Sequence, residues 1–138
     1  MTEIILHEPL DMHLHLRDGA MLRTVAPLSA HSFSGALIMP NLGPPVTDAE
    51  SMRAYRKRIL AAIGDETFEP YMTLFFKPEY DLDFLAPMAE ELTAVKLYPA
   101  GITTNSEGGV SGFDIEELRP ALGALGELGI PLCIHGET

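Results

Sequence analysis

Short apolar segments alternate with helical segments along the whole chain, and this order limits the folds that it can adopt. Five apolar segments have the length and composition of strands, at residues 12–16, 35–40, 69–77, 93–99 and 130–136. Four helical segments separate them, at residues 20–31, 47–64, 82–92 and 114–128, and Thr47 and Glu50 have the spacing of a capping box. Strands that alternate with helices form βα units and a parallel sheet. The sequence therefore predicts an α/β fold.

Two α/β folds fit this order, a doubly wound open sheet and a (β/α)8 barrel. The glycine fingerprint of a dinucleotide-binding sheet is absent after the first strand. Polar residues gather instead where strands end: His13, His15, Arg17, Asn41, Lys96 and His135. A site built from the carboxyl ends of several strands is typical of the barrel. A barrel needs ~250 residues and this sequence has 138. We therefore expect residues 1–138 to form a single partial domain, the first five strands and four helices of a TIM-type barrel that is truncated at its C-terminus.

The charge balance argues against two classes of partner. The chain has 20 Asp and Glu against 9 Lys and Arg, a formal net charge of −11. Such an acidic chain repels phosphate backbones and anionic lipid, so we expect neither nucleic acid nor a membrane as its partner. Cys133 is the only cysteine, which excludes an internal disulfide and fits a reducing compartment. Because the first residues lack the pattern of a signal peptide, we expect a cytoplasmic protein.

The segment from His13 to Arg17 has the pattern of a metal site. Residues two apart on a strand point to the same face, so we expect His13 and His15 to project side by side. Two neutral imidazoles in this arrangement can share one metal ion. The alternative is that both are polar residues on the wet face of an edge strand. Arg17 weighs against that alternative, because a permanent cation beside two histidines suits an anionic substrate group.

Lys96 interrupts the apolar strand at residues 93–99. A lysine is rarely buried without a partner, so one interpretation is that its side chain reaches solvent from the strand end. The other is functional: a desolvated lysine loses its proton readily, and the neutral amine can take up carbon dioxide to form a carbamate. This group can bridge two metal ions, with His13 and His15 on the first and His135 on the second. A metal pair ~3.5–4 Å apart can generate hydroxide at neutral pH and polarise a carbonyl group.

Five segments together resemble the dihydroorotases of the compact, single-function bacterial type, in the cyclic amidohydrolase superfamily. They are Met12–Gly19, Met39–Thr47, Lys96–Ala100, Thr103–Ser106 and His135–Glu137. The His-x-His pattern alone marks only the superfamily, but together with the Pro-Asn and Lys-Leu-Tyr-Pro segments the match is specific. The resemblance covers essentially all of this chain and less than half of a family member.

The resemblance implies a metal-binding role for four residues. His13 and His15 would bind a first zinc ion, and His135 would bind a second. Carboxylated Lys96 would bridge the two ions and take part in catalysis. Glu137, close behind His135, is a candidate to orient that imidazole. A further zinc-binding histidine, the aspartate that handles the proton and another substrate-binding histidine would lie on later strands, beyond residue 138.

The resemblance also implies the reaction and the substrate contacts. The reaction would be the reversible cyclisation of N-carbamoyl-L-aspartate to L-dihydroorotate in pyrimidine synthesis, by a homodimeric enzyme. Arg17 and Asn41 would hold the substrate carboxylate, and two threonines would lie on a mobile loop that closes over the substrate. The residues expected to contact the substrate are His15, Arg17, Asn41, Thr103, Thr104 and His135.

Two other classes of function fit part of the pattern. Hydantoinases and allantoinases share the His-x-His pattern and the carboxylated lysine, but Arg17 and Asn41 suit a substrate with a free carboxylate. A non-catalytic fragment that serves as a structural or assembly partner is the second class. The intact residues His13, His15 and Lys96 argue against a decayed relative. The early end of the chain favours a fragment that is inactive alone.

Overall fold

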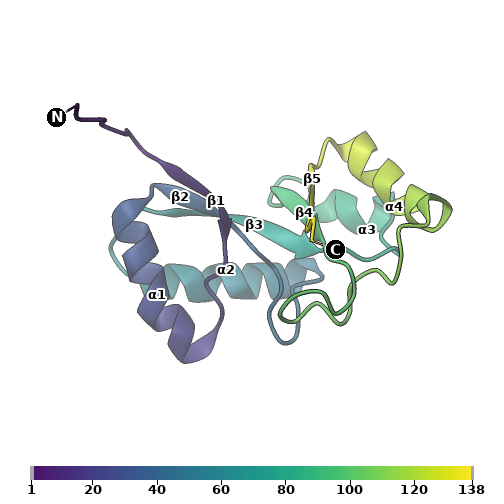
Figure 1. Ribbon diagram of the computed structural model, residues 1–138, viewed down its shortest axis with the longest axis horizontal. Helices are drawn as coiled ribbons and strands as arrows, with labels where there is room; N and C mark the ends of the chain where they lie inside the picture. Colours follow the sequence, from purple (N-terminus) through teal and green to yellow (C-terminus); the bar gives the residue numbers. More distant parts are fainter. Residues whose placement is uncertain (1, 138) are drawn as a thin grey trace.

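The computed structural model describes residues 2–137 and contains one five-stranded parallel sheet (Figure 1). The strands are β1 (Leu10–Leu14), β2 (Gly35–Ile38), β3 (Glu69–Phe75), β4 (Ala94–Leu97) and β5 (Leu132–Ile134). The helices are α1 (Gly19–Ser32), α2 (Ala49–Ile63), α3 (Leu82–Leu85) and α4 (Ile115–Leu128), with a 3-10 turn, η1 (Ala86–Met88), directly after α3. Each strand pairs with the next strand in the chain. This order excludes the doubly wound sheet, where the strand order reverses at a switch point, and confirms the predicted partial barrel.

Alternate residues of the strands face two different sides of the sheet. Ala36 and Ile38 of β2 belong to the large apolar cluster that the helices cover. Leu37 and Met39 belong to a second, small cluster together with Ala94 of β4. We call this second side the inner face, because it corresponds to the interior of a closed barrel. Lys96 lies on the inner face, since it follows Ala94 by two residues.

The start of α2 differs from the prediction by one residue. The N-cap is Asp48, whose carboxylate accepts a hydrogen bond of 2.7 Å from the Ser51 backbone N–H. Ser51 Oγ in turn accepts one of 3.2 Å from the Asp48 backbone N–H, which completes the capping box. The predicted pair Thr47 and Glu50 is therefore wrong. Thr47 lies before the helix, and its carbonyl oxygen accepts a hydrogen bond from the Tyr80 hydroxyl.

The third helix is shorter than the predicted segment 82–92. α3 ends at Leu85 and continues only as the turn η1. Pro87 explains the early end, because proline has no backbone N–H and its ring clashes with the carbonyl four residues before it. Leu85 and Met88 are nevertheless buried in the cluster that the helices cover. None of the helices in the described part of the chain is long and apolar enough to cross a membrane.

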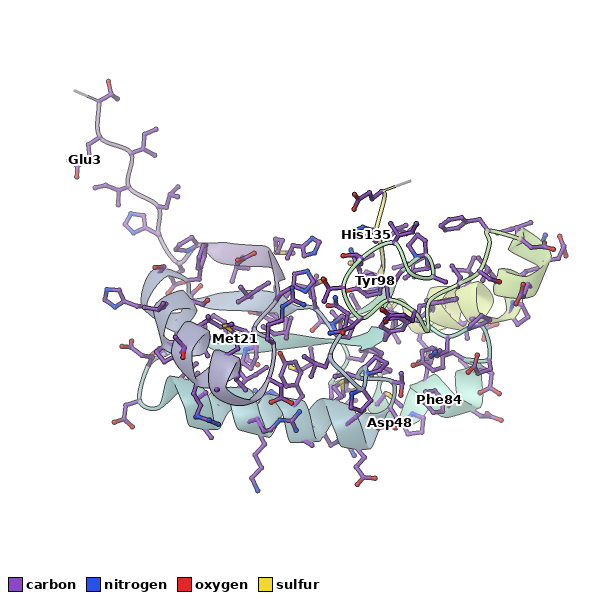
Figure 2. The ribbon with its side chains drawn as sticks, turned by 60° about the horizontal axis from the view of Figure 1, so that its bottom comes forward. Glu3, Met21, Asp48, Phe84, Tyr98 and His135 are labelled. Carbon is purple, nitrogen blue, oxygen red and sulfur yellow. The ribbon has the colours of Figure 1, made fainter. Side chains whose placement is uncertain are left out.

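The segment before β1 extends away from the sheet (Figure 1, Figure 2). Its apolar side chains have little cover: Ile4 is 82% exposed, Ile5 67% and Leu6 73%. Among residues 2–137, β1 and β5 also pair on one side only, because they stand at the two ends of the strand order. Exposed apolar side chains and open strand edges favour association with other surfaces.

Gly35, at the start of β2, is packed too closely for a side chain. A Cβ atom there would lie 2.7 Å from the Glu69 backbone oxygen and 2.9 Å from a ring carbon of Tyr71. The backbone oxygen cannot move away without disturbing the pairing of β2 with β3. We predict that Gly35→Ala lowers the free energy of unfolding by about 1–3 kcal/mol, measured by urea denaturation of a complete barrel that contains this chain.

Gly123→Ala is the matched control for this substitution. Gly123 lies within α4, and no atom lies within 4 Å of a Cβ added there. Alanine is favoured over glycine inside a helix by about 0.5–1 kcal/mol, so this variant should be at least as stable as the original chain. Equal stability of the two variants would contradict this account of the contact between β2 and β3.

Candidate active site

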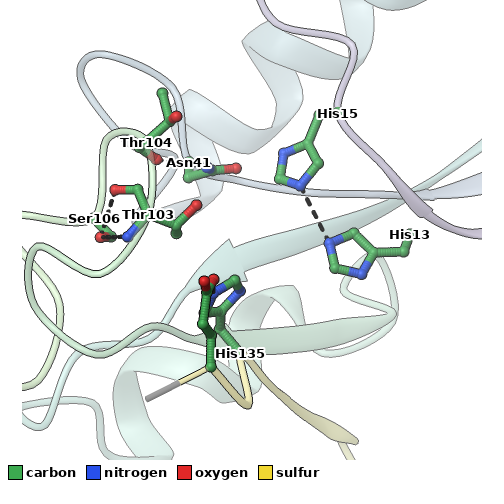
Figure 3. Close-up of polar contacts among 8 residues, drawn as sticks. His13, His15, Asn41, Thr103, Thr104, Ser106 and His135 are labelled. Atoms are coloured by element: carbon green, nitrogen blue, oxygen red, sulfur yellow. Dashed lines mark hydrogen bonds and ion pairs between the residues drawn. The ribbon is translucent and has the colours of Figure 1, made fainter.

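The two histidines of the first strand meet near its carboxyl end (Figure 3). β1 lies two residues earlier than the predicted 12–16, so His13 belongs to the strand and His15 follows it. The rings still face one another, with their Nε2 atoms 3.1 Å apart. Burial lowers the pKa of both imidazoles, and the charge of Arg17 lowers that of His15 further. Both rings are therefore neutral at neutral pH, the form in which imidazole binds a metal ion.

Lys96 lies in β4 and is only 3% exposed. The interpretation that its side chain reaches solvent from the strand end is therefore wrong. Burial lowers the pKa of its ammonium group, and the Lys96 charge adds to the effect of burial in lowering the pKa of His13. The Nζ atom lies 5.5 Å from the centroid of the Tyr98 ring. A lysine in this setting loses its proton more readily than a lysine in water.

Arg17 lies where the chain turns from β1 into α1. Its φ is +59°, in the left-handed region, so the extended backbone ends here, directly before α1. The Arg17 carbonyl oxygen accepts a hydrogen bond of 2.8 Å from the Tyr55 hydroxyl of α2. Its guanidinium Nη1 is buried and has no hydrogen-bond partner among the described residues. A buried N–H of a cation without a partner is suited to an anionic ligand.

Asn41 joins the end of β2 to the loop 100–112. Its Nδ2 donates a hydrogen bond of 2.8 Å to the Thr104 carbonyl oxygen, and its Oδ1 accepts one of 3.1 Å from the Tyr98 hydroxyl. Asn105 Nδ2 donates to the Asn41 carbonyl oxygen at 3.1 Å. A carbonyl oxygen can only accept, so Thr104 determines which end of the Asn41 amide faces the loop. The loop is thereby tied to the sheet beside the histidine pair.

Thr103 and Thr104 lie in a tight turn of this loop (Figure 3). The fully buried Ser106 closes the turn: its Oγ accepts a hydrogen bond of 2.9 Å from the Thr103 N–H and donates one of 2.7 Å to the Thr103 carbonyl oxygen. Gly109 has no room for a side chain, since a Cβ there would lie 2.3 Å from the Tyr98 carbonyl oxygen. These contacts place both threonines beside Asn41, and the mobility of the loop stays a prediction.

His135 approaches the same region from the end of β5 (Figure 3). Its Nε2 lies 3.0 Å from a carboxylate oxygen of Glu137, the residue expected to orient it. Its ring stacks on Tyr98, with the ring centroids 6.0 Å apart. The charge of His135 contributes to the lowered pKa of His13, after burial and the charge of Lys96.

The metal donors supplied by unmodified side chains are few. Among residues 2–137, no group of three or more His, Cys, Asp or Glu side chains lies close enough to hold a metal ion. His13 and His15 supply two adjacent imidazole nitrogens, and the buried Lys96 is the group beside them. These residues fit a metal ion if Lys96 provides oxygen ligands as a carbamate, because its amine alone adds no anionic donor.

Tyr98 is a site residue that the sequence pattern did not single out. Its hydroxyl bonds Asn41, its ring stacks on His135 and the Lys96 Nζ lies close to the ring. Its spacing from Lys96 could have identified it, because Tyr98 follows Lys96 by two residues and so shares the inner face. Asn105 belongs to the same network, but no local pattern reveals a contact with a residue 64 positions away.

The chain is similar to dihydroorotases over its whole length. It is 53% identical over 142 residues to the dihydroorotase of Ruegeria sp. (strain TM1040), in an alignment that covers 100% of this chain and 40% of that relative. The chain thus spans about 40% of the length of the curated relatives that it matches. No family model matches it.

Solved structures show the same similarity. The crystal structure of dihydroorotase from Campylobacter jejuni has a TM-score of 0.92 and 60% identity, covering 95% of this chain and 38% of that chain. The dihydroorotase of Saccharomyces cerevisiae, in complex with 5-fluoroorotic acid, has a TM-score of 0.83 and 36% identity, covering 94% and 36%. An L-hydantoinase from Arthrobacter aurescens has a TM-score of 0.71 at 17% identity, covering 95% and 29%, and shows the fold alone. The sequence and the fold of this chain are together similar to those of the N-terminal portion of dihydroorotases.

Proposed function

We propose that this chain carries the N-terminal part of the active site of a zinc-dependent dihydroorotase. The reaction is the reversible cyclisation of N-carbamoyl-L-aspartate to L-dihydroorotate, with loss of water, in pyrimidine synthesis. The proposal includes the single partial barrel domain over residues 1–138, a cytoplasmic location and a homodimeric enzyme.

One observation supports the proposal most directly: a pair of neutral imidazoles and a buried lysine share the inner face of the sheet. His13 and His15 approach within 3.1 Å, and Lys96 is 3% exposed. A lysine is rarely buried without a partner, and here two imidazoles, one exposed and one partly buried, lie on the same face. Among the described residues, no carboxylate forms an ion pair with any of these three. A bound metal pair would give all of them a partner.

The residues of this chain have distinct tasks in the proposed enzyme. His13 and His15 would hold one zinc ion, His135 would hold the other, and carboxylated Lys96 would bridge them. The bound zinc pair supplies a nucleophile from water at neutral pH and polarises the carbonyl group of the ring. Glu137, 3.0 Å from the His135 imidazole, would keep that ligand oriented.

The substrate carboxylate would be bound by Arg17. Its buried Nη1 lacks a partner, and its planar guanidinium matches a carboxylate with two parallel hydrogen bonds. Asn41 has two amide hydrogens and gives one to Thr104, and the other would contact the substrate beside His15, whose pKa a hydrogen bond from the Asn41 side chain also affects. The Saccharomyces cerevisiae relative is in complex with 5-fluoroorotic acid, and an acid as ligand supports this assignment. An arginine in this place also favours dihydroorotate over the substrates of hydantoinases and allantoinases.

A chimera tests the proposal. This chain would replace the matching N-terminal portion of the Campylobacter jejuni dihydroorotase, to which it is 60% identical. We expect the purified chimera to hydrolyse L-dihydroorotate and to leave hydantoin and allantoin unchanged, measured by the change in absorbance of each ring. A chimera that turns over hydantoin or allantoin in preference would contradict the assignment of the substrate.

The isolated 138-residue chain is the control for this experiment. It lacks the residues that the family carries on later strands, so we expect no turnover and weak binding of zinc. We also expect self-association, seen by light scattering, because Ile4, Ile5 and Leu6 are exposed and two strand edges are open. A monomer with a sharp cooperative melt and measurable turnover would overturn the view that the chain needs the rest of the barrel.

Lys96→Ala in the chimera should abolish activity, because both metal ions lose their bridge. We expect less than about a tenth of the original rate, a lower zinc content by atomic absorption, and partial rescue by short carboxylic acids that replace the carbamate. Lys57→Ala, which changes an exposed lysine of α2, is the control and should behave as the original chimera. A Lys96→Ala chimera that keeps more than about a tenth of the original rate would refute the bridging role of Lys96.

Arg17→Met in the chimera should affect the substrate and not the metal. Loss of one partner of a buried charged pair costs about 2–5 kcal/mol, so most of kcat/KM should disappear while the zinc content stays the same. Arg23→Met, at an exposed position of α1, is the matched control. Zinc loss as the main effect would show that Arg17 has been assigned to the wrong partner.

A further inference from the structure

The backbone of Arg17 is held in a conformation that arginine seldom adopts. Its φ is +59°, and Gly19, two residues later, has a φ of +58°. Glycine tolerates this region freely. A non-glycine residue stays in it only where the surrounding structure imposes it. The contacts around the Arg17 peptide therefore bear on where its guanidinium lies.

Two side chains of α2 supply those contacts. The Tyr55 hydroxyl donates a hydrogen bond of 2.8 Å to the Arg17 carbonyl oxygen. Arg58, three residues further on the same helix face, donates two hydrogen bonds, of 3.1 and 2.9 Å, to the Asp18 carboxylate. The Arg58 and Asp18 side chains are 44% and 43% exposed, whereas Tyr55 is fully buried. Water therefore weakens the ion pair more than the tyrosine contact.

Tyr55 can act only as a donor in this contact. Its partner is a carbonyl oxygen, and burial raises the pKa of Tyr55, so that the hydroxyl keeps its proton. At the other end of the same residue, the guanidinium Nη1 is buried and has no hydrogen-bond partner among the described residues. Arg17 thus connects a buried hydroxyl of the helix layer with the residues of the candidate active site.

We propose that Tyr55 is a positioning residue for the candidate active site. Its hydrogen bond to the Arg17 carbonyl oxygen holds Arg17 in the left-handed conformation, and this conformation sets the position of the guanidinium, whose Nη1 is buried without a partner among the described residues. The kinetic consequence rests on the proposed function, because it assumes that Arg17 binds the substrate carboxylate. The structural consequence rests only on the contacts of Tyr55, Arg17 and Asp18.

Tyr55→Phe tests the kinetic consequence, because it removes one hydroxyl and keeps the ring. In the chimera, KM for L-dihydroorotate should rise about tenfold, the effect of losing one buried hydrogen bond, while kcat changes less than twofold. The zinc content should stay the same, because His13 and His15 keep their positions. A merely structural role would lower the amount of folded enzyme and leave KM unchanged.

Tyr80→Phe is the matched control. Tyr80 is also buried, and its hydroxyl donates to the carbonyl oxygens of Thr47 and Phe75, neither of which is a predicted site residue. Both variants lose a buried hydroxyl contact and should be destabilised to a similar degree. Only Tyr55→Phe should raise KM. An equal KM in the two variants overturns the proposal.

Trypsin tests the structural consequence without any enzyme activity. In the purified chimera, with or without turnover, release of the fragment 1–17 reports how often the peptide bond after Arg17 opens to the protease, measured by mass spectrometry. We expect Tyr55→Phe to accelerate this cleavage about tenfold relative to Tyr80→Phe. Equal rates of cleavage overturn the proposal, because the hydroxyl would then not hold Arg17.

The two experiments separate the failure of this inference from the failure of the proposed function. A chimera without turnover refutes the proposed function and leaves the protease experiment to decide the role of Tyr55. An active chimera whose KM is unaffected by Tyr55→Phe refutes the role of Tyr55 and leaves the proposed function in place.

Discussion

The pairing of β4 with its two neighbours decides where the chemistry of this chain lies. Lys96 is opposite Phe75 of β3 on one side and opposite Cys133 of β5 on the other. A slip of one residue would turn every side chain of β4 to the opposite face. Lys96 would then enter the apolar cluster that the helices cover, and Val95 or Leu97 would take its place on the inner face. The same backbone hydrogen bonds therefore fix the core and the candidate active site together.

The fold could be predicted from the sequence because each strand and each helix has its own local pattern of apolar residues. The strands are short and apolar, the helices between them have their own periodicity, and this order favours a parallel sheet. His13, Lys96 and His135 could be assigned to one site for the same reason, since the carboxyl ends of parallel strands meet at one edge. Tyr98 was not among the predicted site residues, although it follows Lys96 by two residues and therefore shares the inner face.

Contacts between distant segments could not be predicted from local patterns. Asn41 bonds a residue 63 positions away, and Tyr55 bonds one 38 positions away. The Thr47 carbonyl oxygen accepts a hydrogen bond from Tyr80, 33 positions away, and the cap of α2 is Asp48. Each of these contacts depends on the arrangement of elements in space. The shape of the candidate site therefore follows from tertiary structure, while its list of residues follows from the sequence.

The segment from His13 to Asp18 also limits how sequences of this kind can diverge. Within it lie an imidazole pair, a left-handed arginine and the carboxylate that caps α1 through the Gly19 N–H. Each group needs its own direction relative to the strand. A substitution changes one of them, whereas an inserted or deleted residue would also change the direction of every group that follows it. We therefore expect this segment to tolerate a change of residue better than a change of length.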